Sequence, residues 1–237
     1  MTFSYIDFLT TFGVGGAHPG GLKLTKELLS RELIEDTTSI LDVGCSTGQT
    51  SAYIAQKYGC QVISLGSNKV MLEKAKQRFL SLQLPIEVKE GNTERLPFND
   101  DLFDFIISES VTAFTNVSLS IPEYKRVLKP TGTLLAVEMV LEKKIPQEEH
   151  ENLREFYGFS KLFLEEEWRS LFHETGFTDV QIQKASHNFD ENDVSSVPDF
   201  LLSEDIDEEI YRILEKHESY TKMYNDILGF RVFRCST

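Results

Sequence analysis

Short apolar runs alternate with longer amphipathic stretches over the first two thirds of the chain. Runs rich in β-branched residues and bounded by Gly, Asn or Asp predict strands at residues 39–43, 61–65, 86–89, 103–108 and 133–139. Apolar positions at helical spacing predict helices over residues 50–57, 69–80 and 121–128. Nearly continuous apolar strands separated by helices are typical of a parallel sheet covered on both faces. We therefore expect a doubly wound α/β domain.

The pattern changes after Val140. Two strand-like runs remain, at residues 178–183 and 230–234, and the residues between them are acidic and mostly helical in pattern. Consecutive hairpin strands need only a short turn, so this separation indicates an insertion. The insertion contributes to a strong charge imbalance, because 22 acidic and 11 basic residues lie from position 141 onward.

Composition limits the classes of partner. The 237 residues carry a formal charge of −14, which disfavours nucleic acid and anionic membrane surfaces. We find neither an apolar run long enough to span a bilayer nor a basic secretory leader, and expect a cytoplasmic protein. The three cysteines and five histidines lack metal-ligand spacing, so no metal site is expected.

The segment from Ile40 to Thr50 is the most informative part of the sequence. An apolar strand leads into Gly44, a short loop contains Gly48, and a helix follows. This is the first βα turn of a doubly wound sheet, where ligands bind at the carboxyl ends of strands. Ser46 stands where a dinucleotide fingerprint has its second glycine, and no Walker A lysine follows. A nucleoside ligand without phosphates is the option that remains.

Five segments in register resemble the class I S-adenosylmethionine-dependent methyltransferases, specifically the small-molecule enzymes of the ubiquinone and menaquinone-biosynthesis type. They are the glycine loop, the EGNTERLPF segment at 90–98, FDFIISE at 103–109, RVLKPTGTL at 126–134, and the stretch from Trp168 to Val180. The resemblance implies a seven-stranded Rossmann-like sheet, mostly parallel, with an antiparallel last strand. It also implies S-adenosylmethionine as the cofactor.

The resemblance carries a set of cofactor-binding residues to this chain. These are Asp42, Gly44, Cys45, Ser46, Gly48 and Gln49 in the first motif, Gly66, Ser67 and Asn68 after the second strand, Asn92 and Thr93 after the third, and Glu109 after the fourth. Two positions depart from the family pattern: Gly66 replaces the acid that binds the ribose hydroxyls, and Asn92 replaces the Asp that faces the adenine amino group. Weaker cofactor binding, a variant cofactor and loss of methyl transfer are all compatible with these departures.

Glu109 and His18 are the candidate catalytic residues. Glu109 ends the fourth strand, where a carboxylate could act as a substrate-facing base or bind a backbone group or the methionine ammonium. His18 lies among five glycines in residues 12–21, just before a helix expected at 22–33. Histidine is a common general base, so His18 could act as one, whereas the alternative is an exposed residue in a flexible hinge.

We therefore expect one methyltransferase domain, with an N-terminal lid and helix (1–37), a cofactor-binding core (38–184), an acidic helical insertion (185–228) and a last strand (229–237). Residues 3–23 and 188–228 together are expected to form the lid. The expected reaction is methyl transfer to O, N or C of a small molecule, and a homodimer is left open. The alternative is a catalytically reduced relative that binds a ligand or regulates a partner.

Overall fold

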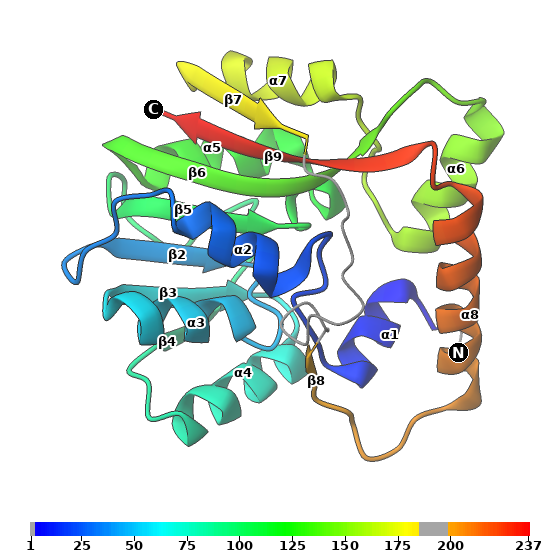
Figure 1. The fold of residues 1–237 in the computed structure, drawn as a ribbon, viewed down its shortest axis with the longest axis horizontal. Helices are drawn as coiled ribbons and strands as arrows, with labels where there is room; N and C mark the ends of the chain where they lie inside the picture. The colour runs from blue at the N-terminus through cyan, green and yellow to red at the C-terminus, as the bar shows by residue number, and fades with distance from the viewer. Residues whose placement is uncertain (1–2, 185–198) are drawn as a thin grey trace.

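A computed structural model describes residues 3–184 and 199–237 of the chain. Within them, seven strands form one sheet in the order β4-β3-β2-β5-β6-β9-β7 (Figure 1). The strands are β2 (Ser39–Val43), β3 (Gln61–Gly66), β4 (Glu87–Glu90), β5 (Phe103–Glu109), β6 (Leu128–Leu141), β7 (Asp179–Gln183) and β9 (Leu228–Ser236). All neighbours pair in parallel except β9, which is antiparallel to both β6 and β7. The expected fold class is confirmed.

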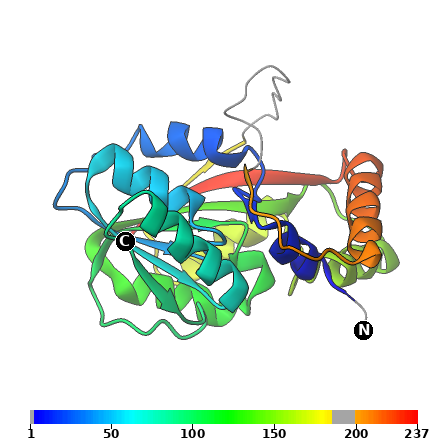
Figure 2. The same ribbon diagram turned by 90° about the horizontal axis from the view of Figure 1, so that it is seen from below.

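Helices cover both faces of this sheet (Figures 1 and 2). On one face lie α2 (Gly21–Leu29), α3 (Gln49–Tyr58) and α4 (Lys69–Ser81), with Leu29 and Ile54 packed against Ile40 of β2. The opposite face carries α5 (Val117–Val127) and α7 (Glu165–Glu174). Burial on both faces explains why the parallel strands read as continuous apolar runs.

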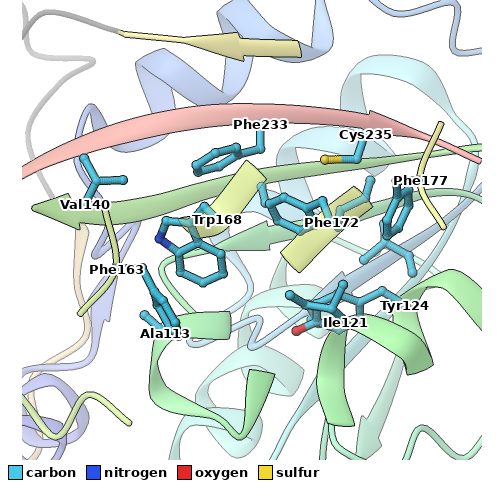
Figure 3. Packing of buried hydrophobic residues seen from close by; sticks show 14 of the residues in the cluster. Ala113, Ile121, Tyr124, Val140, Phe163, Trp168, Phe172, Phe177, Phe233 and Cys235 are labelled. Carbon is cyan, nitrogen blue, oxygen red and sulfur yellow. The ribbon is translucent and has the colours of Figure 1, made fainter. Parts of the chain in front are cut away.

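The larger core lies between the sheet and the α5–α7 face. Trp168 and Phe172 of α7 stack with ring centroids 5.8 Å apart and both contact Phe233 of β9 (Figure 3). The indole Nε1 of Trp168 donates to the Met139 carbonyl oxygen at 3.1 Å, so the ring is buried with its polar group satisfied. This packing holds β9 between β6 and β7.

Several predicted boundaries need correction. The helix expected at 22–33 ends at Leu29, and Leu33 is 83% exposed because it lies beyond the packed turns. The strand expected at 133–139 extends over Leu128–Leu141, because pairing with β9 continues to Leu141 and Leu128 pairs with Phe103 of β5. Part of the expected insertion, residues 185–198, lies outside the described residues.

Three helices gather beyond the ends of the central strands: α1 (Tyr5–Phe12), α6 (Gln147–Tyr157) and α8 (Glu208–Met223) (Figures 1 and 2). Aromatic rings join them, since Tyr5 lies 4.9 Å from Tyr157 and 5.2 Å from His217, measured between centroids. A two-residue strand after α1, β1 (Val14–Gly15), pairs antiparallel with β8 (Asp199–Phe200). Segments from both ends of the chain therefore meet here.

Candidate functional site

The strand order changes direction between β2 and β5. From β2 the chain adds β3 and β4 on one side, then crosses over to place β5 on the other side of β2. In open α/β sheets ligands bind in the crevice at such a switch point, outside the carboxyl ends of the strands. Two turns border it here: the glycine loop after β2 (44–48) and the turn after β5 (110–114), which includes the 3₁₀ helix η1 (Thr112–Phe114).

The glycine loop and the turn after β5 are in direct contact. Gly44 is exposed and has a φ of +65°, and a Cβ placed on it would overlap the side chain of Val111. Gly48 has a φ of +75°, and a Cβ there would overlap the ring of Phe79 on α4. The first glycine therefore allows the two turns to approach, while the second allows α3 to pack on α4.

Two serines at this edge have an unusual backbone conformation, and one of them also has a buried hydroxyl without a hydrogen-bond partner among the described residues. Ser46 and Ser110 adopt left-handed φ angles of +48° and +55°, which are uncommon for residues with a side chain. The Ser110 Oγ is buried and has no partner among the described residues. Strained backbone and unsatisfied buried polar atoms concentrate at ligand sites, so these residues fit a polar cofactor at the switch point.

A second glycine-rich segment, residues 13–21, lies against the glycine loop. The Ser46 hydroxyl donates to the Val14 carbonyl oxygen at 2.9 Å. A Cβ on Gly15 would lie 3.0 Å from the Thr47 Oγ1, and one on Gly16 would lie 2.7 Å from the Gln49 Oε1. The glycines of this segment thus permit close approach to the glycine loop. The flexible-hinge interpretation did not include this contact.

Two basic residues of α4 bind the segments that lie over the glycine loop, residues 10–21 and 199–201 (the covering segments). Lys74 donates to the carbonyl oxygens of Thr10 at 2.9 Å and Leu201 at 2.6 Å. Arg78 donates to the Thr47 carbonyl oxygen at 2.8 Å and pairs with Asp199 of β8. Burial lowers the pKa of Lys74. The N-terminal segment, β8 and the glycine loop are consequently held to one helix.

His18 and Glu109 meet in the structure. The His18 Nε2 lies 3.3 Å from the Glu109 Oε2, and the side chains are 2% and 10% exposed. Thr25 of α2 donates to the Glu109 Oε1 at 2.6 Å, and Thr50 of α3 donates to the Oε2 at 2.8 Å. The other imidazole nitrogen, Nδ1, lies 3.2 Å from the Pro19 carbonyl oxygen. His18 is therefore not an exposed loop residue, and Glu109 joins three segments.

Some of the side chains expected near the ribose and adenine are already hydrogen-bonded within the protein. Asn68 caps α4, because its Oδ1 accepts from the amides of Val70 and Met71. The Asn92 Oδ1 accepts from the Glu94 amide within its own turn, and Thr93 is buried with its Oγ1 3.3 Å from the Ser120 Oγ. The Asn68 Oδ1 is thus already used as a helix cap, whereas the Ser67 side chain is exposed.

Asp42 and Cys45 lie beneath the glycine loop. Asp42 accepts from the Ser51 hydroxyl, which accepts in turn from Ser64. Burial raises the pKa of Asp42 to about 7, although the bond from Ser51 acts against this shift. Burial and the nearby Asp42 raise the pKa of the Cys45 thiol well above its usual range, so Cys45 is a poor nucleophile. Both side chains support the loop from within.

Sequence reasoning missed one buried carboxylate, Glu138 of β6. Its oxygens accept from the amides of Thr112 at 2.9 Å and Ala113 at 3.3 Å, which fixes the turn after β5. Burial raises the pKa of Glu138 to about 7. An isolated Glu inside an apolar strand was the available signal, because such a group must find buried donors. Thr25 and Thr50, the partners of Glu109, carried no comparable signal.

No group of three or more His, Cys, Asp or Glu side chains suited to a metal ion occurs among residues 3–184 and 199–237. No helix in the described part of the chain is both long and apolar enough to cross a membrane.

Comparisons with known proteins agree on one family. A profile described as a methyltransferase domain matches residues 41–136. The chain is 36% identical to an uncharacterized methyltransferase, YodH, of Bacillus subtilis over 97% of each chain. It is 25% identical to phosphoethanolamine N-methyltransferase 1 of Arabidopsis thaliana, over 75% of this chain and 36% of that protein.

Solved structures share the fold. Phosphoethanolamine N-methyltransferase 2 of Haemonchus contortus, in complex with S-adenosyl-L-methionine, superposes with a TM-score of 0.80 at 17% identity. The match covers 98% of this chain and 57% of that one. The MccD protein matches with a TM-score of 0.73 at 18% identity, covering 94% of this chain and 99% of the other.

Gly44→Ala tests the glycine loop. We expect at least about a tenfold loss of affinity for S-adenosylhomocysteine by calorimetry, because the added methyl group separates the loop from Val111. Gly59→Ala is the matched control: Gly59 has a φ of +66° and open space around its Cβ position. Both variants carry a backbone strain of about 1–2 kcal/mol, so equal loss of affinity in both would contradict the assignment.

Asp42→Asn tests the buried carboxylate through the pH dependence of stability. With its pKa raised to about 7, folded Asp42 retains a proton that the unfolded chain releases near pH 4. Its contribution to the free energy of unfolding therefore falls as pH rises from about 4 to about 7, then levels off. Denaturant titrations should show the variant gaining on the wild type by up to about 4 kcal/mol over this window. Parallel pH curves for the wild type and Asp42→Asn would contradict a raised pKa of Asp42.

Proposed function

The chain belongs to the class I S-adenosylmethionine-dependent methyltransferases, and on this premise we propose that it methylates a small molecule at the switch point between β2 and β5. The contact between the glycine loop and the segment 13–21 supports this proposal most directly. That contact surrounds the carboxyl ends of the two central strands with backbone groups and buried polar side chains. Such an enclosed edge can exclude water from a reacting methyl group.

The residues that would hold the cofactor are those of the two bordering turns. The backbone of Gly44, Cys45 and Ser46 would contact its polar parts, together with the Ser110 hydroxyl, which has no partner among residues 3–184 and 199–237. Asn92 and Thr93 would border the adenine. When bound, S-adenosylmethionine supplies an electrophilic methyl group. The contribution of the chain is to position both reactants, which is the largest protein contribution to an in-line displacement.

His18 and Glu109 act in this proposal as a positioning pair. The His18 Nδ1 lies near the Pro19 carbonyl oxygen, and the Nε2 lies near both the Glu109 carboxylate and the Thr25 hydroxyl, so both ring nitrogens already have protein partners. With no ring nitrogen directed elsewhere, positioning fits the geometry better than proton removal from the acceptor. The pair joins the covering segment to the end of β5 and so fixes the acceptor side of the site.

We propose a small amine as the acceptor, with oxygen and carbon acceptors as the alternatives. Relatives named for N-methylation of phosphoethanolamine and of glycine, sarcosine and dimethylglycine support nitrogen. The charge of −14 also favours cations over anions near the protein surface. A cytoplasmic location is part of the proposal because the three cysteines are free and buried.

Ligand-induced stabilisation and a transfer assay test the function. S-adenosylmethionine and S-adenosylhomocysteine should raise the melting temperature of the purified protein, because both would bind only the folded state. Incubation with labelled S-adenosylmethionine and a panel of small amines, phenols and carbon acids should label an amine. Failure of both ligands to stabilise the protein would support the catalytically reduced alternative instead.

His18→Ala should lower kcat for the methylated amine by at least about tenfold, because the covering segment loses its bond to Glu109. His18→Gln should restore part of the rate, since an amide N–H can still donate to the carboxylate. His173→Ala, at an exposed position on α7, is the matched control. Equal loss in the Ala and Gln variants, or a change confined to the melting temperature, would contradict the positioning role.

A further inference from the structure

Glu138 of β6 is a buried carboxylate that the proposed reaction does not use. It is 0% exposed and lies on the face of the sheet that α5 and α7 cover, between Ala136 and Val140 of the apolar core. Burial raises its pKa to about 7, so its charge at neutral pH carries a free-energy cost that a neutral side chain would avoid. A carboxylate that is unfavourable for the fold is a candidate for a role in the site.

The Glu138 carboxylate binds the turn after β5 from the core side. Its Oε1 accepts from the Thr112 amide at 2.9 Å, and its Oε2 accepts from the Ala113 amide at 3.3 Å. The Ser108 hydroxyl of β5 also donates to the Oε1 at 3.4 Å and lies 2.9 Å from the Thr112 hydroxyl. All these donors belong to β5 or to the turn that follows it. The carboxylate therefore joins this turn to the neighbouring strand β6.

The other side of the same turn packs against the glycine loop. Val111, immediately before Thr112, occupies the space that a Cβ on Gly44 would need. Ser110 before it has the left-handed φ of +55°, and its amide donates to the Val137 carbonyl oxygen at 2.7 Å. Bonds to β6 thus hold the turn on both sides of Val111. A strained turn keeps its form only while such bonds fix it, so the position of Val111 against the glycine loop depends on them.

Two titratable side chains lie next to Glu138 on neighbouring elements. Burial raises the pKa of Tyr124 on α5 to about 12, so this phenol stays neutral at physiological pH. Arg231 of β9 is in register opposite Glu138, but its guanidinium is bonded to Glu142 and Glu165. The amide and hydroxyl donors of the turn are therefore the groups that favour the charged form of Glu138.

We propose that Glu138 is a positioning residue of the methyltransferase site, whose carboxylate holds the turn after β5 against the glycine loop and thereby controls cofactor binding. This inference rests on the proposed function. Protonation places a donor on an oxygen that faces amide donors, so at least one bond to the turn is lost and the turn can relax. The charged form is the one that holds the turn. Because it predominates above about pH 7, cofactor affinity falls as the pH drops below this value.

Calorimetry with S-adenosylhomocysteine at several pH values tests the proposal. The wild-type Kd should rise by about fivefold or more from pH 7.5 to pH 6. Glu138→Gln keeps the size of the side chain but turns an NH₂ group toward the amide donors, so it should bind about tenfold more weakly at pH 7.5 and lose this pH dependence. Asp42→Asn is the matched comparison, because burial also raises the pKa of Asp42 to about 7, and it should keep the wild-type pH dependence.

Two results would overturn the proposal: wild-type affinity in folded Glu138→Gln, or a weaker affinity that still changes with pH as in the wild type. The second result is the one expected if Glu138 served only the stability of the fold. A fall in melting temperature alone would likewise leave no positioning role.

Amide hydrogen exchange of the wild type, measured by NMR, tests the same bonds without a substitution. After correction for the intrinsic effect of pH, protection of the Thr112 and Ala113 amides should fall by about fivefold or more from pH 7.5 to pH 6. The amides of residues 134–136 in β6 should keep theirs. Unchanged protection at Thr112 and Ala113 would overturn the proposal even if Glu138→Gln does not fold. If protection falls as expected but the wild type binds no S-adenosylhomocysteine at any pH, the proposed function fails instead.

Discussion

The site depends on how closely backbone segments approach at the carboxyl ends of β2 and β5. Three contacts set this distance: Gly44 against Val111, Gly15 against Thr47, and Gly16 against Gln49. A Cβ on Gly44 would overlap Val111 at 2.3 Å, and a Cβ on Gly15 or Gly16 would crowd the Thr47 or Gln49 side chain at 3.0 or 2.7 Å. The glycines therefore determine which polar groups share one enclosed edge, including the hydroxyls of Ser46 and Ser110.

Much of the fold could be predicted from the sequence because it follows from local periodicity. A buried parallel strand is largely apolar on both faces, so the apolar runs at residues 39–43 and 61–65 could be predicted as strands. The glycine loop then fixes the strand after which the ligand edge begins. The end of α2 was less predictable, because Leu33 continues the apolar spacing but lies beyond the last turn that packs on the sheet.

The side-chain pairs of the site could not be predicted in the same way. His18 and Glu109 were singled out separately, but nothing in local sequence indicates that residues this far apart in the chain meet. Asn68 shows the opposite error, because its place before a helix suits it for capping as well as for ligand binding. Glu138 was visible as a carboxylate in an apolar run, yet its amide donors come from a distant turn.

The covering segments come from both ends of the chain and are held by polar contacts as well as by the aromatic rings that join α1 to α8. Lys74 and Arg78 bind them to α4, and the Ser46 hydroxyl binds Val14. Polar contacts exchange for bonds to water when they open, so their net contribution is about 1 kcal/mol each. The apolar core around Trp168 and Phe172 lies on the opposite face of the sheet from α4, to which these polar contacts are anchored. These polar contacts can therefore open while the central strands that position Gly44 and Glu109 keep their apolar packing.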